Sequence, residues 1–340
     1  MGAKNRKSGR RRKSKKKSIL APILIFILLL AAGIFLFYTC RTQQEAARGE
    51  GPKSEQGGPD LPGEPPPDTS RPDKPERQPE ELSLTDTIRI FSFNIQVFGQ
   101  SKMAKPEVVN ILADIVSRSD LTAVQEVRSV AIEPVEQFMR LLPSRYAYVL
   151  GPREGRTSSK EQYWFIYNTE RMTVKDYRTW DDPHDVFERN PLAVYFETAG
   201  KFDFIVINNH IQPSSAAEEI AALPGVVGYY RQLWGEPDVL VVGDFNADGS
   251  YFNENFMESI FDESGYFSII SNEYDTTVAA NEHTYDRFII TLSAREDFTG
   301  SFGVLRFDEL YDFSRFSILP RHVSDHYPVW AEFYLNMDTD

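Results

Sequence analysis

The sequence predicts an α/β domain of two packed β-sheets flanked by helices, spanning residues 86–340. Short apolar or alternating runs, each typical of a strand, outnumber the amphipathic segments that are typical of helices. The helices are too few to separate most consecutive strands, as a singly wound parallel sheet would require. The chain has 340 residues, of which 41% are hydrophobic, so it can bury a large core.

The net charge of −13 is distributed unevenly along the chain. It divides into +10 for residues 1–18, −4 for residues 41–85 and −19 for residues 86–340. Domains that capture nucleic acid at long range are usually basic. The charge of this domain therefore argues against tight, long-range capture of DNA.

The N-terminal segment predicts a membrane anchor. Residues 19–38 read ILAPILIFILLLAAGIFLFY, an uncharged run that would span about 30 Å of hydrocarbon as a transmembrane signal-anchor helix. The basic residues 1–18 should stay cytoplasmic, which makes the rest of the chain extracytoplasmic, either periplasmic or extracellular. The alternative is a cleaved signal peptide, but the run is longer than usual and no A-x-A-like site follows it.

Residues 39–85 predict a disordered linker, because they are rich in Pro, Gly and Glu and nearly free of large apolar side chains. Prolines bias such a tether toward extended conformations. Cys40 is the only cysteine, so the domain can form no internal disulfide. We interpret Cys40 as a spare thiol; lipid attachment is the alternative, although FYTC lacks the small residue usual before a lipid-carrying cysteine.

The domain opens with a strand, a helix and a second strand. IRIFSFNI (88–95) has the apolar content of a buried strand. PEVVNILADIVSRSD begins with Pro106 and repeats apolar residues at helical spacing, and LTAVQEV (121–127) reads as the next strand. Further strands are predicted at 145–150, 162–168, 172–179, 192–198, 202–208, 238–243, 286–292 and 327–335, and further helices at about 131–142 and 216–233.

Polar residues cluster where these strands end. Each has an ordinary structural explanation on its own, such as capping a turn or occupying a solvated strand end. Their joint occurrence in one domain instead indicates a single site. The residues are Asn94, Glu126, His210, Asp244, Asn246, Asp286, Asp325 and His326.

The motifs FNIQVFG, AVQEVR, GRTSSKEQYWFIYN, NNHIQPSSAAEEI, VVGDFNADGSY, TYDR and SDHYPV occur in that order. Together they resemble the deoxyribonuclease I-like branch of the endonuclease/exonuclease/phosphatase superfamily, over about residues 86–335. The resemblance implies a four-layer α/β sandwich. It also implies an endonuclease that hydrolyses phosphodiester bonds of double-stranded DNA with Mg²⁺ or Mn²⁺.

The resemblance also implies roles for individual residues. Asn94 and Glu126 resemble the magnesium ligands, with Asp325 close to the same ion. Asp244 and Asn246 resemble residues that bind the scissile phosphate or a second ion. His210 would pair with Glu161, and His326 with Asp286; we expect His326 to act as the base and His210 as the acid.

Further family features concern DNA and calcium. Arg128, Arg156, Arg189 and Tyr251 match groups that approach DNA, but the family's tyrosine three residues after the arginine of its GR motif is Ser159 here. Asp248, Asp275, Thr277 and Asn281 match a structural Ca²⁺ site, and Gly249 and His283 stand where the family has a disulfide. A second calcium loop, DDPHDVFERNP, looks degraded, since it is shorter and has Asn190 where an acidic ligand is expected. We expect one structural calcium ion, with a second left open.

Two other functions remain open from the sequence. One is a phosphatase or sphingomyelinase-like phosphodiesterase of the same superfamily, which membrane anchoring would suit. The other is a catalytically inactive binding scaffold, which the presence of every expected catalytic residue disfavours. The resemblance suggests a monomer and implies no protein partner.

Overall fold

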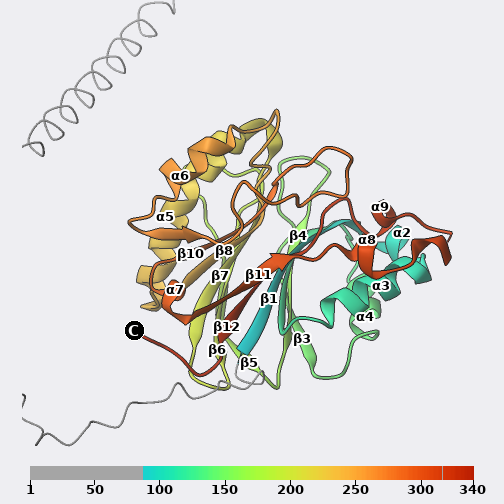
Figure 1. Ribbon diagram of the computed structural model, residues 1–340, viewed down its shortest axis with the longest axis horizontal. Helices are drawn as coiled ribbons and strands as arrows, with labels where there is room; N and C mark the ends of the chain where they lie inside the picture. Colours follow the sequence, from blue (N-terminus) through green and yellow to red (C-terminus); the bar gives the residue numbers. More distant parts are fainter. Residues whose placement is uncertain (1–86, 316) are drawn as a thin grey trace, which may run out of the picture. The chain divides into compact units, whose positions relative to one another are not determined.

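The computed structural model describes residues 87–315 and 317–340, which form two six-stranded mixed sheets packed face to face (Figure 1). The first sheet has the order β11-β12-β1-β2-β4-β3 and the second β5-β6-β7-β8-β10-β9. Each contains one parallel pair, β1 with β2 and β7 with β8. The strands are β1 Thr87–Phe98, β2 Leu121–Val127, β3 Tyr146–Leu150, β4 Gln162–Asn168, β5 Met172–Thr179, β6 Leu192–Thr198, β7 Asp203–His210, β8 Val239–Asp244, β9 Tyr266–Ser268, β10 Asp286–Thr291, β11 Phe298–Val304 and β12 Val329–Tyr334.

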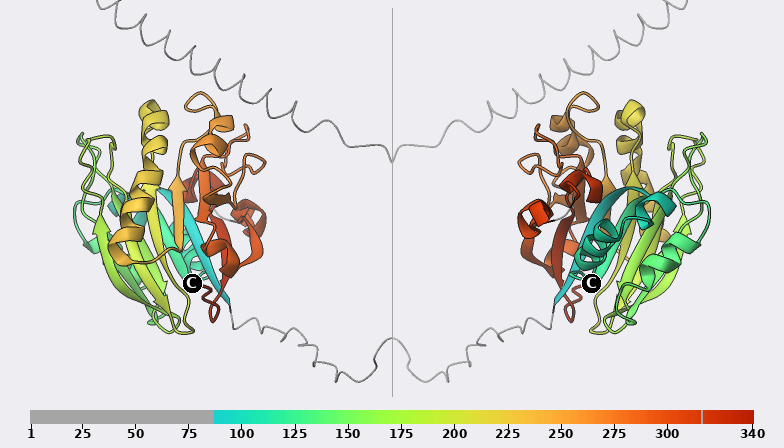
Figure 2. Two further views of the ribbon diagram at one scale, coloured as in Figure 1. Left: turned by 90° about the vertical axis from the view of Figure 1, so that its left-hand side faces the viewer. Right: turned by 90° about the vertical axis from the view of Figure 1, so that its right-hand side faces the viewer.

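Helices cover the outer face of each sheet, which gives the four-layer sandwich expected from the sequence (Figures 1 and 2). The first sheet is covered by α2 Gln100–Met103, α3 Pro106–Val116, α4 Glu133–Met139, α8 Phe307–Leu310 and α9 Pro320–Val323. The second is covered by α5 Ala216–Trp234 and α6 Met257–Ile260, while α7 Ala294–Asp297 follows β10. Single 3₁₀ turns occur at Pro213–Ser215, Glu254–Phe256 and Phe313–Arg315.

Strand β1 contributes apolar side chains to the packed layers on both of its faces. Ile88 and Ile90 point into the core between the sheets, whereas Phe91 and Phe93 point out toward the helices on the first sheet. A strand buried on both faces needs apolar residues at even and odd positions, which explains its nearly continuous apolar run. The polar Asn94 continues the inward-facing set at the point where the strand reaches the end of the core.

Most predicted elements match the observed ones to within a few residues. The strands predicted at 121–127, 162–168, 172–179 and 192–198 have the predicted bounds. The predicted helix at 131–142 is shorter, running from Glu133 to Met139. Strands β9 and β11 were not predicted, because β9 has three residues and β11 is a partly buried edge strand with a register shift.

The predicted basic segment, membrane span and linker, with Cys40, lie outside the described residues. Among residues 87–315 and 317–340, no helix combines the length and apolarity needed to cross a bilayer. All the described residues lie within residues 86–340, the range predicted for the domain.

The two parallel pairs bring functional residues to one end of the sandwich. Asn94 of β1 and Glu126 of β2 lie near the carboxyl ends of one pair, while His210 of β7 and Asp244 of β8 end the other. The backbones of β7 and β8 approach so closely at Gly243 that a Cβ there would lie 1.9 Å from the Asn209 carbonyl oxygen. Glycine at this position, with φ of 140°, is therefore a requirement for the geometry of the strand end.

Candidate active site

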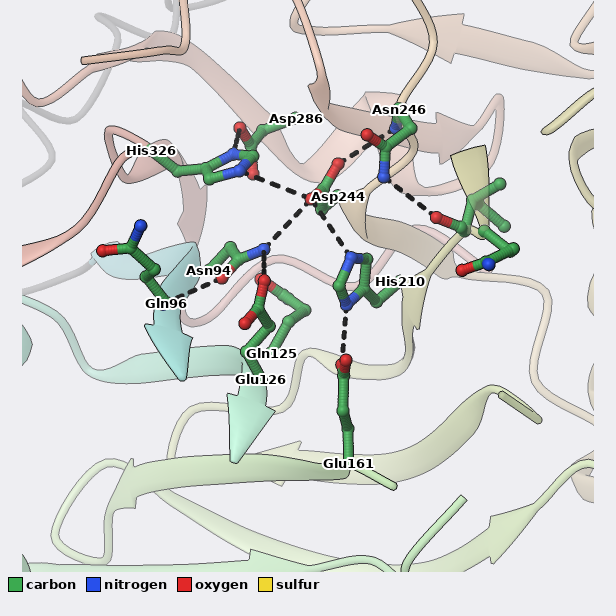
Figure 3. A network of polar contacts seen from close by, with 12 residues as sticks. Asn94, Gln96, Gln125, Glu126, Glu161, His210, Asp244, Asn246, Asp286 and His326 are labelled. Atoms are coloured by element: carbon green, nitrogen blue, oxygen red, sulfur yellow. Dashed lines mark hydrogen bonds and ion pairs between the residues drawn. The ribbon is translucent and has the colours of Figure 1, made fainter. Parts of the chain in front are cut away.

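Asp244 lies at the centre of the polar cluster, with three side chains directed at its Oδ2 atom (Figure 3). Asn94 donates from Nδ2 at 3.0 Å, and the Nε2 atoms of His210 and His326 lie 3.4 and 3.5 Å away. The other oxygen, Oδ1, accepts the backbone N–H of Asn246 at 3.0 Å. Groups from both sheets therefore converge on one buried carboxylate.

Each histidine is oriented by a second carboxylate on its far side. The Nδ1 atom of His210 lies 2.7 Å from Glu161 Oε2, and that of His326 lies 2.7 Å from Asp286 Oδ2. Because Nδ1 is engaged by a carboxylate, Nε2 of each ring is left facing Asp244. The result is two carboxylate–imidazole pairs that face the same point from opposite sides (Figure 3).

The Glu161–His210 pair is buried among charges. Burial alone would raise the pKa of Glu161, but His210, Arg189 and Arg128 outweigh it and lower that pKa to about 2. Burial and Arg189 act to lower the pKa of His210, while Glu161 and Asp244 raise it above its usual value. Glu161 is thus a permanent carboxylate at neutral pH that favours the protonated imidazole.

The Asp286–His326 pair is also buried. Burial raises the pKa of Asp286 to about 6, with His326 opposing the shift. Burial would lower the pKa of His326, but Asp286 and Asp244 raise it well above the usual histidine value. Asp286 Oδ1 is buried without a hydrogen-bond partner among the described residues, so the paired Oδ2 carries the interaction with His326.

Asn94 and Glu126 form the oxygen-rich side of the site. Asn94 Nδ2 donates to Glu126 Oε1 at 3.2 Å as well as to Asp244, and Asn94 Oδ1 accepts the backbone N–H of Gln96 at 2.9 Å. Glu126 Oε2 accepts the backbone N–H of Val97 at 2.9 Å. The carboxylates of Glu126 and Asp244 are therefore held on either side of one amide.

The backbone around these residues is strained. Gln96, Val97, Glu126 and Asn246 all have φ between 46° and 65°, in the left-handed region that non-glycine residues seldom occupy. Four such residues within one site fit the tendency of strained backbone to gather at functional centres. Hydrogen bonds from the backbone of Gln96 and Val97 to Asn94 and Glu126 help to hold the conformation.

The donor set fits a hard divalent cation. Glu126 and Asp244 supply carboxylate oxygens and Asn94 an amide oxygen, and Mg²⁺ takes one or two carboxylates together with waters. The Asn94 amide nitrogen faces the carboxylates of Glu126 and Asp244. A cation bound between those carboxylates would instead favour the amide oxygen on that side. The Asp325 side chain is half exposed, with Oδ1 3.9 Å from His326 Nε2, so it borders the site beside that histidine.

The four residues predicted to approach DNA differ in exposure. Arg128 lies between Glu126 and Glu161, at 3.2 and 2.8 Å, and also donates to Ser159 Oγ at 3.0 Å. Arg189 is buried, donating to the His210 carbonyl oxygen at 3.0 Å, with its NH1 atom 3.6 Å from Glu161.

Two of the four are open to solvent. Arg156 is about half exposed and pairs with Asp185 at 2.9 Å. Tyr251 is exposed beside Tyr285, with ring centroids 5.7 Å apart, and the Tyr285 ring lies 6.3 Å from that of His326. Arg156 and Tyr251 are thus available to an incoming ligand, whereas Arg189 chiefly supports Glu161 and His210.

The sequence interpretation missed four supporting residues. Tyr163 accepts the backbone N–H of His210 at 2.8 Å, and Ser324 donates to the Asn94 carbonyl oxygen at 2.6 Å. Glu219 is buried and accepts hydrogen bonds near the first turn of α5. Lys102 donates to the Val323 carbonyl oxygen at 2.8 Å; burial lowers its pKa to about 8, although Asp325 and Glu126 oppose the shift. Of these four residues, only Tyr163 could have been identified from the sequence, because it belongs to the KEQY motif.

The residues of the predicted calcium site lie in two adjoining loops. Asp248 and Asp275 line one cleft of about 270 Å³. Asp275 Oδ1 accepts hydrogen bonds from both the N–H and the hydroxyl of Thr277 at 3.1 Å, and that hydroxyl also approaches the carbonyl oxygen of Asn281 at 3.3 Å. Arg306 NH1 lies 3.2 Å from Asp275 Oδ2, so a cation here would share that carboxylate with an arginine.

The loops contact each other where the family's disulfide was expected. A Cβ on Gly249 would lie 3.2 Å from the His283 ring, and His283 Nδ1 lies 3.1 Å from Asp248 Oδ2. The second loop also reaches His326 of the polar cluster, because Thr277 and His326 form an isolated β-bridge. The Asp248–His283 contact thus joins the loops in place of a covalent link.

Known proteins of one family are similar to this chain. Residues 91–326 match the Endonuclease/Exonuclease/phosphatase family. The chain is 33% identical to Deoxyribonuclease-1 of Rattus norvegicus over 261 residues, covering 73% of this chain and 92% of that protein. It is 34% identical to Deoxyribonuclease-1 of Gallus gallus over 263 residues, covering 73% and 93%.

Two solved structures show the same fold at low sequence identity. An endonuclease/exonuclease/phosphatase family protein from Bacteroides thetaiotaomicron aligns with a TM-score of 0.53 and 15% identity, covering 75% of this chain and 98% of that one. D. rerio TDP2, solved with a single-strand DNA product, aligns with a TM-score of 0.53 and 13% identity, covering 73% and 98%.

Proposed function

This chain belongs to the endonuclease/exonuclease/phosphatase family, and from that premise we propose that it is a metal-dependent endonuclease that hydrolyses phosphodiester bonds of double-stranded DNA. The observation that carries the proposal is the convergence of His210 and His326 on Asp244, each backed by its own carboxylate. Hydrolysis of a phosphodiester needs one group to take a proton from water and another to give one to the leaving oxygen. Two oppositely placed imidazoles supply both.

We assign His326 as the base that activates water and His210 as the acid that protonates the leaving oxygen. A cation held by Glu126 and Asp244 would oppose the carboxylates that raise the pKa of His326, so that its Nε2 atom could accept a proton. Asp286 and Glu161 fix the two rings so that both Nε2 atoms face the reacting phosphate, which would lie beside Asp244. Asn94, Glu126 and Asp244 would hold Mg²⁺ or Mn²⁺, which supplies positive charge to balance that of the transition state. Asn246 would bind a phosphate oxygen.

The contacts to DNA would come from the groups open to solvent near this site. Arg156 and Tyr251 have the exposure that such contacts need, and Arg128, which is about one-third exposed, lies closer to the centre. Ser159 offers no ring to stack on a sugar, so its hydroxyl instead orients Arg128. A Ca²⁺ ion held by Asp248, Asp275, Thr277 and Asn281 would stabilise the loop that bridges to His326.

We also propose that residues 19–38 anchor the chain in a membrane with the domain extracytoplasmic and residues 39–85 as a tether. The support is the uncharged 20-residue run that follows ten basic residues. The protein should remain in the membrane pellet after alkaline carbonate extraction, and protease added outside intact cells should remove the domain. Release of the intact chain by carbonate would contradict the anchor.

The nuclease is tested by cleavage of supercoiled plasmid by the purified full chain in detergent with Mg²⁺ and Ca²⁺. We expect nicking that is abolished by EDTA and reduced about 10³-fold or more by His326→Ala. His184→Ala, which removes an exposed histidine, should retain wild-type activity. If the wild-type chain leaves plasmid intact but hydrolyses sphingomyelin or a phosphomonoester, the nuclease proposal fails.

The assignment of acid and base is tested with an aryl phosphodiester whose leaving group needs no proton. On this substrate His210→Ala should retain a larger fraction of wild-type activity than it does on DNA, because its acid is no longer needed. His326→Ala should lose similar fractions on both substrates. Selective recovery of His326→Ala instead would reverse the two roles.

A further inference from the structure

The end of the sandwich opposite the active site carries a second cluster of carboxylates. Asp203 begins β7, Glu236 and Asp238 directly precede β8, Asp297 ends α7, and Asp340 follows β12. We call these five residues the basal cluster. Asp238 and the catalytic Asp244 lie at opposite ends of β8, about 20 Å apart at about 3.3 Å per residue. The cluster is therefore separate from the site described above.

Three members have the spacing of cation ligands. One carboxylate oxygen from each of Glu236, Asp238 and Asp340 lies within 4.8 Å of the other two. Ca²⁺ binds oxygens at about 2.3–2.6 Å, so two ligands on opposite sides of the ion are separated by roughly 5 Å. The three oxygens can thus bind one ion with little movement.

The burial of Asp238 points independently to a missing partner. Asp238 is only 1% exposed, and neither of its carboxylate oxygens has a hydrogen-bond partner among the described residues. The nearby Ser293 hydroxyl donates instead to the Pro237 carbonyl oxygen at 2.8 Å. An isolated buried carboxylate without hydrogen bonds costs several kcal/mol, so some positive charge or proton must compensate.

Basic side chains do not provide that compensation. Within the described part of the chain, no Lys, Arg or His forms an ion pair with Glu236, Asp238 or Asp297. Lys175 reaches only the edge of the cluster, at 3.8 Å from Asp203, and is closer to Glu197 at 2.9 Å. Asp297 is also fully buried, with Oδ1 unpartnered.

Burial and mutual repulsion both act on the carboxyl groups of the basal cluster. Burial raises the pKa of Glu236 and of Asp238 to about 8 in each case, and neighbouring carboxylates add to both shifts. Burial likewise raises the pKa of Asp297 to about 6.

We propose that the basal cluster binds one Ca²⁺ ion through Glu236, Asp238 and Asp340, with Asp297 beside it. Carboxylate-rich, partly irregular oxygen sites suit Ca²⁺, which accepts six to eight ligands in flexible geometry, better than the smaller Mg²⁺. A cleft of about 420 Å³ lined in part by Gly235, Glu236 and Pro237 opens beside the site. The ion would join the segment after β12 of the first sheet to the start of β8 of the second.

The test measures bound calcium per chain by equilibrium dialysis on the full-length protein in detergent. The double variant Glu236→Gln/Asp238→Asn should bind one Ca²⁺ fewer than the wild-type chain. The matched variant Asp262→Asn/Glu263→Gln, which removes two exposed carboxylates, should bind the wild-type number. Equal calcium content in the wild-type chain and the basal double variant would overturn the proposal and indicate that protons alone neutralise the cluster.

The double variant changes two buried residues and could fail to fold, so a second variant changes an exposed ligand instead. Asp340→Asn changes an exposed residue and should weaken one class of Ca²⁺ sites about tenfold, because affinity depends on the number of charged ligands. The rate of substrate hydrolysis should not change, since the cluster lies far from the catalytic groups. Unchanged calcium affinity in Asp340→Asn would overturn the assignment of this ligand set.

Discussion

Glu161 connects the charges of one half of the candidate active site. Its Oε2 atom pairs with His210, while Oε1 faces Arg128 at 2.8 Å and Arg189 at 3.6 Å. Removing one member of such a buried group leaves the others uncompensated. The orientation of His210 and the stability of the domain should therefore both depend on this single carboxylate.

Glu161→Gln should destabilise the domain by about 3 kcal/mol near neutral pH, since a pKa lowered to about 2 corresponds to a carboxylate favoured in the folded state. For a carboxyl with a lowered folded-state pKa, the stability is present above the unfolded value of about 4.5 and is lost as pH falls toward 2. Urea unfolding of both proteins from pH 3 to 7 should thus show a difference that shrinks in acid.

The matched control for that series is Glu170→Gln, an exposed glutamate on the turn after β4. It should leave the free energy of unfolding within about 0.5 kcal/mol of the wild-type value across the range. A Glu161→Gln deficit that stays constant from pH 7 to pH 3 would contradict the charge-based explanation and point to packing alone.

At the scale of elements, the first turn of α5 supports the loops around the active site. Glu219 is fully buried and accepts the N–H of Glu188 and of Gln212 at 3.1 Å each, and the Ser215 hydroxyl at 2.7 Å. One helical side chain therefore holds the segments that flank Arg189 and His210. Burial raises the pKa of Glu219, although these three donors and Arg189 oppose the shift.

Glu219→Ala should cost about 1–3 kcal/mol of stability, because it leaves buried backbone donors without partners. It should also lower the rate of DNA cleavage by displacing the segments beside His210. Glu218→Ala, at the exposed neighbouring position, should do neither. Urea unfolding and plasmid nicking measure the two effects, and equal behaviour of the two variants would rule out this role for the first turn of α5.

The close approach of β7 and β8 gives a second prediction at this scale. Gly243→Ala should prevent formation of the native strand end, because its Cβ would lie 1.9 Å from the Asn209 carbonyl oxygen at a φ of 140°. Gly228→Ala, in α5, would bring the added carbon within 4 Å of no atom beyond the adjoining backbone of its own helix, and should instead stabilise by up to about 1 kcal/mol. Soluble yield and thermal unfolding distinguish them; a folded, active Gly243→Ala protein would refute the prediction.

At the scale of the whole molecule, the proposed nuclease is an acidic domain acting on an acidic polymer. Residues 86–340 carry a net charge of −19, so the few arginines near the site must provide the attraction. Such a domain should bind DNA weakly, and each phosphate contacted contributes about 0.9 to the slope of log affinity against log salt. We therefore expect a shallow salt dependence that reflects only a few contacts.

Arg156→Ala should reduce that slope by about one unit and weaken binding, if this half-exposed arginine contacts a phosphate. Affinities are measured with duplex DNA from 50 to 200 mM salt in the His326→Ala background, so that the DNA remains uncut. Arg295→Ala, which removes an exposed arginine at the end of the sandwich opposite the active site, should keep the original slope. Equal slopes for both variants would exclude Arg156 from the interface.

The sequence determined the order of the elements and the types of residue at the site. The apolar pattern of a strand is a local feature of the sequence. The bounds of β2 and of β4 to β6 could therefore be predicted correctly. The three-residue β9 and the edge strand β11 were missed because their pairing comes from distant strands. Polar residues at strand ends predicted a candidate site, since parallel neighbouring strands deliver such residues to one edge.

Only the tertiary structure decided how these residues meet. It showed that Asp244 lies between His210, at the end of β7, and His326, in the segment before β12, and that Arg189 is buried beside Glu161. It also revealed the burial of Glu219 and the basal cluster, whose members are separated by up to 137 positions along the chain. Burial and long-range proximity are set by the packing of whole layers, and no local sequence pattern records them.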